Sequence, residues 1–162
     1  MAKAKPEPTP EEVEERRERF DGYLADALLK PLGYFKHDAD AHDDPKLQDL
    51  RDVLGMAGYG RYWLLVEVLA GREAHQYEVE DRRSGRDRWA RFAMDLEFDG
   101  GPSQAKAFIG TLEELHLIDR ELYEARGVVS IRRLADNAYE MAEATAKRRM
   151  GAWRTNQKGG GR

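Results

Sequence analysis

Cysteine is absent from the 162 residues of this chain. Its absence excludes disulfides, thiolate-bound zinc or iron–sulfur sites and a cysteine nucleophile. Long apolar runs are also missing, because no stretch approaches the roughly 18 residues of a membrane span. The Lys- and Glu-rich start lacks the hydrophobic stretch of a signal peptide. We therefore expect a cytoplasmic protein with no membrane partner.

Catalytic signatures are equally scarce. The sequence contains no Gly-rich phosphate-binding loop, no His-Glu-x-x-His motif and no nucleophile elbow. His116 ends an expected helix, where a cation interacts favourably with the helix dipole, so we interpret it as structural. The sequence therefore predicts a protein that is not an enzyme, with no catalytic residue and no cofactor.

Charge is abundant but unevenly distributed. Charged residues make up 36% of the chain, and the formal net charge is −4. The segment 31–81 has eleven acidic and five basic residues, whereas the segment 147–162 has six basic residues and no acidic one. An acidic protein is not expected to be coated with nucleic acid, but a basic end can still bind phosphate.

Histidines and aspartates cluster between residues 37 and 44. This composition suits a cation site, but a calcium loop starting at Asp38 would need Gly and Glu where the chain has Asp43 and Asp49. We interpret the segment as structural, with Tyr34 and Phe35 packing inward and the residue before Pro45 capping a helix. No metal is expected.

Helical periodicity predicts a mostly α-helical fold. Thr9, Pro10 and Glu12 form a helix-start signature, and an amphipathic helix is predicted over Pro10–Leu29. The same periodicity predicts further helices after Asp44, over 59–70 as the central buried helix, over 86–98, from Ser103, and from near Leu134 into a basic, Gly-rich tail.

Short strands are predicted in two places. Alternation over 75–80 indicates one strand, and the segments 118–123 and 128–131 are predicted to form a β-hairpin. The expected architecture is mostly α with a small β-hairpin, a winged helix-turn-helix plus an N-terminal amphipathic helix. Its expected parts are a leader with the amphipathic helix (1–32), a winged-helix domain (33–140), and a helix end with a basic tail (141–162).

Three motifs resemble a known family. They are Tyr34–Asp40 (YFKHDAD), the helix start Asp44-Pro45-Lys46, and the aromatic run Gly58–Trp63 (GYGRYW). This order resembles the N-terminal domain of phage and plasmid replication-initiator (replisome-organiser) proteins, the DnaD-like winged helices. The later segments 115–119 and 129–133 are similar to its end-of-helix and wing patterns. The resemblance covers roughly 33–139 and implies a module that binds DNA or self-associates. We interpret the aromatic run as core packing rather than a stacking platform for single strands.

The resemblance and the residue types together indicate a DNA interface. The predicted recognition helix would present Ser103, Gln104 and Lys106 to the major groove, although two glutamates later in that helix oppose phosphate. Predicted phosphate contacts are Arg120, Arg126, Arg132 and Arg133 on the wing, and Lys147, Arg148, Arg149 and Arg154 on the tail. A further basic stretch comprises Arg82, Arg83, Arg86, Arg88 and Arg91, and it either adds to the interface or forms a solvated face.

DNA binding by a phage or mobile-element protein is the leading hypothesis, and two alternatives stay open. The acidic segment 31–81 would suit a winged-helix module that binds a host nucleic-acid-handling protein complex, as a small inhibitor of the anti-CRISPR type does. A transcriptional autoregulator is the other alternative. It would require a homodimer, for which the Pro10–Leu29 helix is suited.

Overall fold

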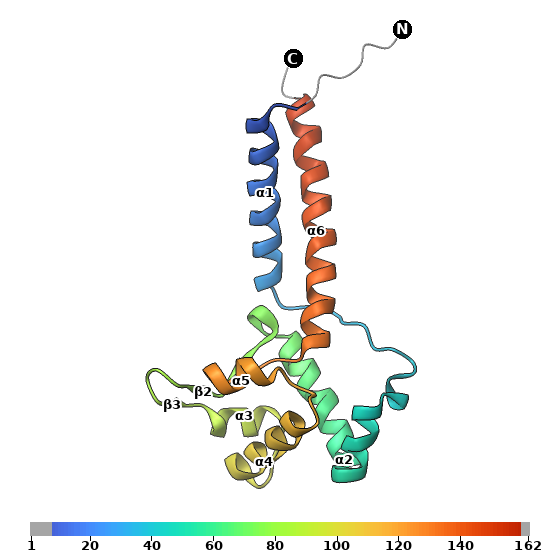
Figure 1. Cartoon of the computed structure of the whole chain (residues 1–162), viewed down its shortest axis with the longest axis vertical. Helices are drawn as coiled ribbons and strands as arrows, with labels where there is room; N and C mark the ends of the chain where they lie inside the picture. The colour runs from blue at the N-terminus through green and yellow to red at the C-terminus, as the bar shows by residue number, and fades with distance from the viewer. Residues whose placement is uncertain (1–7, 160–162) are drawn as a thin grey trace. The chain divides into compact units, whose positions relative to one another are not determined.

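The computed structural model describes residues 8–159 and contains two compact units (Figure 1). Unit 1 combines the N-terminal residues up to Leu29 with the residues from Tyr139 onward, and unit 2 comprises Lys30–Ala138. The fold is mostly α-helical with a small antiparallel β-hairpin, as the sequence predicts. Over the part of the chain that is described, no helix has the length and apolar character needed to cross a membrane.

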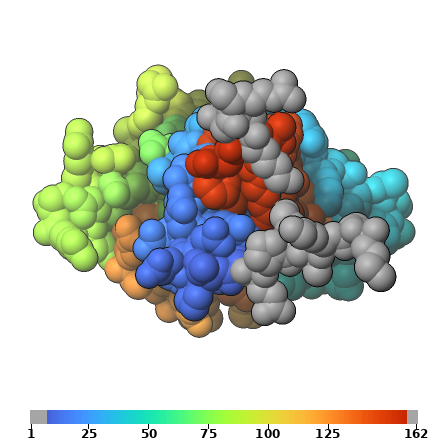
Figure 2. All heavy atoms as spheres, turned by 90° about the horizontal axis from the view of Figure 1, so that it is seen from above, coloured from blue at the N-terminus to red at the C-terminus, as the bar shows by residue number. Residues whose placement is uncertain are grey.

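Unit 1 is an antiparallel pair of helices. α1 (Pro10–Leu29) lies beside the C-terminal part of α6 (Arg132–Gly159), and their ends are seen next to each other in Figure 2. The predicted capping box is present, because Thr9 N donates to Glu12 Oε2 at 3.0 Å and Glu12 N donates to Thr9 Oγ1 at 3.2 Å. α6 continues through basic residues that were expected to lie in a tail. Arginine, lysine, alanine and methionine are all good helix formers.

Unit 2 is built on α2 (Pro45–Ala70). Asp44 caps this helix as predicted, since its Oδ1 accepts from Lys46 N at 2.9 Å. Gly55 interrupts the helix with φ 67° and ψ −169°, a conformation that glycine adopts without a Cβ clash. The second half of α2 buries Tyr62 and Leu65 among other apolar side chains, which confirms the prediction of a central buried helix.

The remaining elements of unit 2 are short. They are η1 (Ala41–Asp43), η2 (Glu73–His75), β1 (Tyr77–Glu78), β2 (Glu80–Asp81), β3 (Arg86–Asp87), α3 (Trp89–Asp95), α4 (Gly101–Glu114), α5 (Arg120–Arg126) and β4 (Val128–Val129). β1 pairs antiparallel with β4, so that Tyr77 lies opposite Val129, and β2 pairs antiparallel with β3, so that Glu80 lies opposite Asp87. Phe92 of α3 and Ile109 of α4 are fully buried between these elements.

The β-hairpin is not at the predicted position. The strand predicted over 118–123 was wrong, because Asp119 Oδ1 accepts from Leu122 N at 3.0 Å and caps helix α5 instead. β4 lies within the predicted segment 128–131, but it pairs with β1. The hairpin is formed by β2 and β3, so the helix predicted over 86–98 begins only at Trp89.

The segment that precedes α2 is held by side-chain contacts. Phe35 packs against the core, whereas Tyr34 is exposed, so the prediction that both aromatic residues pack inward was wrong for Tyr34. His37 stacks on Trp63 with ring centroids 3.8 Å apart, and Asp38 forms an ion pair with Arg133. Members of the histidine and aspartate cluster therefore contribute to packing and to ion pairing.

The buried Tyr62 is expected to make unit 2 sensitive to high pH. Burial, and secondarily the charge of Asp44, raises the pKa of Tyr62 from 10.0 to about 12. Because the folded-state pKa is the higher one, this contribution to stability is fully present below the unfolded value and is lost as the pH rises through the folded value. We expect Tyr62→Phe to resist alkaline unfolding. Relative to the wild type, its free energy of unfolding should rise by about 2–3 kcal/mol from neutral pH to about pH 12. Urea denaturation of both proteins at each pH measures this difference, and parallel pH profiles would contradict it.

Candidate nucleic-acid interface

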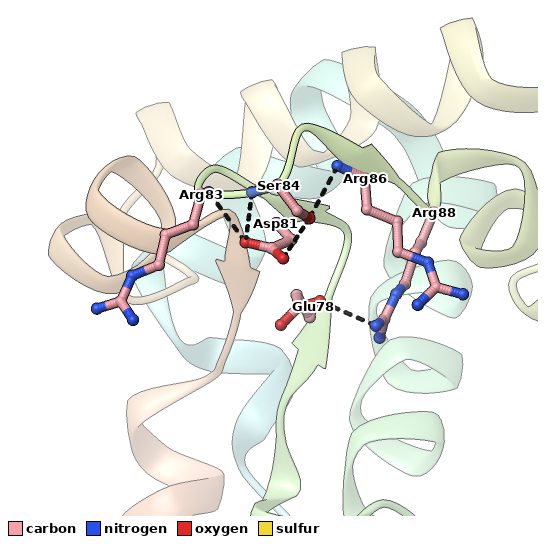
Figure 3. A network of polar contacts seen from close by, with 6 residues as sticks. All are labelled: Glu78, Asp81, Arg83, Ser84, Arg86 and Arg88. Carbon is pink, nitrogen blue, oxygen red and sulfur yellow. Dashed lines mark hydrogen bonds and ion pairs between the residues drawn. The ribbon is translucent and has the colours of Figure 1, made fainter.

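The turn of the β2–β3 hairpin presents arginines to solvent. Arg82 and Arg83 lie in the turn and Arg86 begins β3, and all three are exposed. Figure 3 shows the side chains of Arg83 and Arg86 extending to opposite sides of the turn. Within residues 8–159, no ion pair joins either of these two guanidinium groups to a carboxylate. Their charge is therefore available to an anionic partner.

Asp81 fixes the shape of this turn. Its carboxylate accepts from Arg83 N at 2.9 Å, from Ser84 N at 3.4 Å and from the Ser84 hydroxyl (Figure 3). The hydrogen bond from that hydroxyl, followed by those from the two backbone amides, holds the pKa of Asp81 below its usual value. Gly85 N also donates to Asp81 O at 2.7 Å. The turn is thus preorganised, and the Asp81 carboxylate accepts its hydrogen bonds from groups of the turn itself.

Helix α5 supports the hairpin from one side. Val79 N and Glu80 N donate to Gly127 O at 2.9 and 3.2 Å, and Arg82 Nη2 donates to Tyr123 O at 3.4 Å. The end of α5 therefore lies against β2. Arg126, in the last turn of α5, is exposed and adds a cation beside the hairpin.

The base of the hairpin leads directly into α3. Arg88 forms an ion pair with Glu78 at 3.1 Å, as Figure 3 shows, and Asp87 Oδ1 accepts from Trp89 N at 2.8 Å at the start of the helix. Arg91 forms an ion pair with Asp95 at 2.9 Å. These two arginines of the basic stretch are therefore balanced by carboxylates, unlike those at the turn.

The start of α4 carries the predicted groove-reading residues. Ser103, Gln104 and Lys106 are exposed there. The Gln104 side-chain oxygen accepts from Gly100 N at 2.9 Å and so caps the helix start, which leaves its amide N–H groups as donors. Lys106 Nζ lies 5.6 Å from the centre of the Trp89 ring. Because Trp89 follows the hairpin directly, Lys106 lies close to the hairpin base.

The predicted wing arginines fall into two groups. Arg120 forms ion pairs with Glu124 at 2.8 Å and with Glu113 at 3.5 Å. Arg132 lies 3.8 Å from Asp119, and Arg133 pairs with Asp38. Carboxylates therefore balance three of the four, whereas Arg126 forms no ion pair with any residue that the structure describes.

The predicted tail residues lie on α6, in unit 1. Lys147 pairs with Glu143 at 2.9 Å, and Arg149 pairs with Asp26 at 2.5 Å. Arg148 and Arg154 are exposed, and neither forms an ion pair within the described chain. The hairpin arginines belong to unit 2. The arginines of α6 and those of the hairpin are therefore described as two separate basic surfaces.

Sequence reasoning noted the arginines at 82–91 but not the hairpin that presents them. A local signal was available, because Asp81 is followed at the third and fourth positions by Ser84 and Gly85. Aspartate side chains accept hydrogen bonds from the backbone two or three residues later, and glycine favours turns. This spacing predicts a turn even where the flanking strands are too short and too charged to be recognised.

Comparison with known proteins gives a family match. The family model described as Lin1244/Lin1753-like, N-terminal, matches residues 34–132. The match covers more than half of the chain and includes the hairpin, α4 and α5. No curated protein and no solved structure is significantly similar to the chain.

Proposed function

We propose that this chain, which belongs to the Lin1244/Lin1753-like N-terminal family, binds duplex DNA through the arginine hairpin β2–β3 and is not an enzyme. The observation that carries the proposal is the exposed pair Arg83 and Arg86, neither of which forms an ion pair with a described carboxylate, on a turn that Asp81 holds in shape. Arginine presents N–H donors in a planar fork that matches phosphate oxygens. A preorganised turn loses little conformational entropy when it makes such contacts.

The elements around the hairpin suit a winged-helix mode of binding. In that mode a recognition helix enters the major groove while the wing contacts the neighbouring backbone. Here α4 would supply Ser103 and Lys106, and the hairpin with Arg126 would contact phosphates. The hairpin precedes α4 in the chain, whereas the predicted wing follows it.

The contacts would be mostly to the DNA backbone. Gln104 uses its side-chain oxygen within the helix start, and Glu113 and Glu114 occupy the far end of α4, where they would repel phosphate. Backbone contacts position a protein but carry little sequence information. We therefore expect weak sequence preference and strong salt dependence.

The likeness of the motifs in 34–63 to replication-initiator N-terminal domains supports a finer version of the proposal. In this version the DNA is the replication origin of a phage or mobile element, and the module contributes binding rather than catalysis. Competition between an origin fragment and a scrambled duplex of the same length measures this preference. Equal competition would leave general duplex binding as the function.

We expect Arg83→Ala/Arg86→Ala to bind a labelled duplex about 10- to 100-fold more weakly than the wild type at low salt. Because two phosphate contacts are removed, the slope of log affinity against log salt concentration should become shallower by about 2. Fluorescence anisotropy over a salt series measures both quantities.

The matched control is Arg120→Ala/Arg132→Ala, which removes the same charge from exposed arginines that carboxylates balance. Its affinity should stay within about threefold of the wild type, because a balanced cation attracts phosphate weakly. Equal losses in the two variants would mean that net charge, and not the hairpin, drives binding. A wild type that binds no duplex at low salt would overturn the proposal and favour a protein-binding module.

A further inference from the structure

Unit 1 has few fully buried side chains. No residue of α1 is buried, and within unit 1 the buried apolar residues of α6 are Ala142, Ala146 and Met150 over the described chain. Most helix stability in proteins comes from packing an apolar face rather than from intrinsic helix propensity. Alanines contribute little buried area to offset the entropy lost on ordering two helices. A unit of this composition is expected to pack against a further apolar surface.

One side of the helix pair carries such a surface, here called the apolar face. It consists of the exposed Val13 and the partly buried Phe20, Leu24 and Leu28 on α1 and of the exposed Tyr139 on α6, and helical spacing places the buried Ala146 and Met150 of α6 next to it. Val13 and Tyr139 are each 50% exposed. The opposite side of the pair is a groove whose lining includes Glu15, Glu18, Tyr23 and the ion pair between Asp26 and Arg149. No described aliphatic side chain lines this groove, so the valine and the leucines of the apolar face gather on the other side.

The two helices carry opposite charge. α1 has seven acidic and three basic residues, whereas residues 139–159 have two acidic and five basic ones. Helical spacing places Glu14 of α1 and Arg154 of α6 at the edges of the apolar face. Neither of these two side chains forms an ion pair with another described residue.

This charge pattern is complementary to itself. Two copies can be related by a twofold axis that runs parallel to the helices. In that arrangement, α1 of each copy lies beside α6 of the other copy. Every helix then has two neighbours of opposite charge, and both apolar faces are covered in one step. A partner protein of a single charge would attract one helix and repel the other. The pattern therefore favours a second copy of the chain.

We propose that two copies of this protein associate through the apolar faces of unit 1 and form a four-helix bundle. In this bundle α1 of each copy packs against α6 of the other. Bundles of two helical hairpins bury this kind of stripe in their centre. The proposal depends on unit 1 alone, so a failure of unit 2 to bind DNA would not contradict it.

Sedimentation equilibrium of the full chain tests the bundle. The wild type is expected to have twice the chain mass of 18.6 kDa. Because Val13 and Tyr139 are half exposed within one copy, Val13→Glu/Tyr139→Glu should keep the helix content and raise the dimer dissociation constant at least about tenfold. The matched control is Val53→Glu/Met56→Glu, on residues 60% and 67% exposed in unit 2, and it should leave the constant unchanged. A monomeric wild type at about 100 μM would overturn the proposal, as would equal effects of the two variants.

The helix order in the bundle has its own test. Arg154→Glu should weaken the dimer about fivefold or more, and adding Glu14→Arg to the same chain should restore it. Arg148→Glu changes another exposed arginine, which helical spacing places on the other side of α6, so it should have little effect. Equal weakening by Arg148→Glu and Arg154→Glu, or no rescue by Glu14→Arg, would contradict packing of α1 against the other copy's α6.

Discussion

Replacing Gly127 with alanine is expected to destabilise unit 2 by about 3–5 kcal/mol. Gly127 ends α5 with φ 67° and ψ 31°, a left-handed conformation that costs alanine about 1–2 kcal/mol. A Cβ at this position would also lie 2.2 Å from the backbone oxygen of Glu80 in β2. Such a contact forces α5 away from β2 and breaks the hydrogen bonds that Val79 N and Glu80 N donate to Gly127 O.

Gly85 provides the matched control for this substitution. Its φ of 69° is also left-handed, but a Cβ there would meet no atom within 4 Å. Gly85→Ala should therefore cost only the backbone strain, about 1–2 kcal/mol. Urea denaturation followed by circular dichroism measures both free energies of unfolding. Equal losses would mean that strain alone accounts for Gly127, and that the contact of α5 with β2 contributes nothing.

The starts of α1 and α2 could be predicted from the sequence because their causes are local. The capping box of Thr9 and Glu12 spans four residues, and Asp44 accepts from the amide only two residues later. Each signal is complete within one turn of helix. Tertiary contacts therefore did not need to be known in order to place the starts of α1 and α2.

The short elements of unit 2 could not be predicted in the same way. α5 is only seven residues long, so its ends decide its conformation, and the apolar residues near Ile118 also fit the alternation of a strand. β2 and β3 each have two residues, and all four are charged. Such strands have no hydrophobic period to detect, and they form because the turn at Asp81 and the packing of α5 hold them.

The balance of charge in the candidate site could not be predicted from local sequence. Arg133 pairs with Asp38 from the other end of unit 2, and Arg120 pairs with Glu113 of the preceding helix as well as with Glu124. An arginine count cannot distinguish these cations from Arg83 and Arg86, which form no ion pair with a described carboxylate. The predicted residue types suit phosphate binding, but the fold determines which of these arginines form ion pairs with carboxylates and which do not.

Truncation of Phe92 is expected to lower the free energy of unfolding as much as Gly127→Ala does. The cause here is lost packing rather than a steric clash. Phe92 is fully buried, and its ring lies edge-on to Tyr77 at 4.8 Å and to Trp89 at 5.6 Å between ring centres. Phe92→Ala leaves a cavity between these rings, and such changes cost about 3–5 kcal/mol. Phe92→Leu keeps most of the volume and should cost less than half as much. Thermal and urea unfolding measure both effects.

The same cavity links stability to the proposed DNA interface. Tyr77 belongs to β1, just before the hairpin, and Trp89 follows the hairpin and lies beneath Lys106. A loosened Phe92 site should therefore weaken DNA binding even where the protein is still folded. Met94→Ala, on the same helix but 72% exposed, should change stability by no more than about 0.5 kcal/mol and leave affinity unchanged. If Phe92→Ala bound DNA as tightly as Met94→Ala at a temperature where both are folded, the hairpin would be positioned independently of the core. The interface would then depend on the turn and α5 alone.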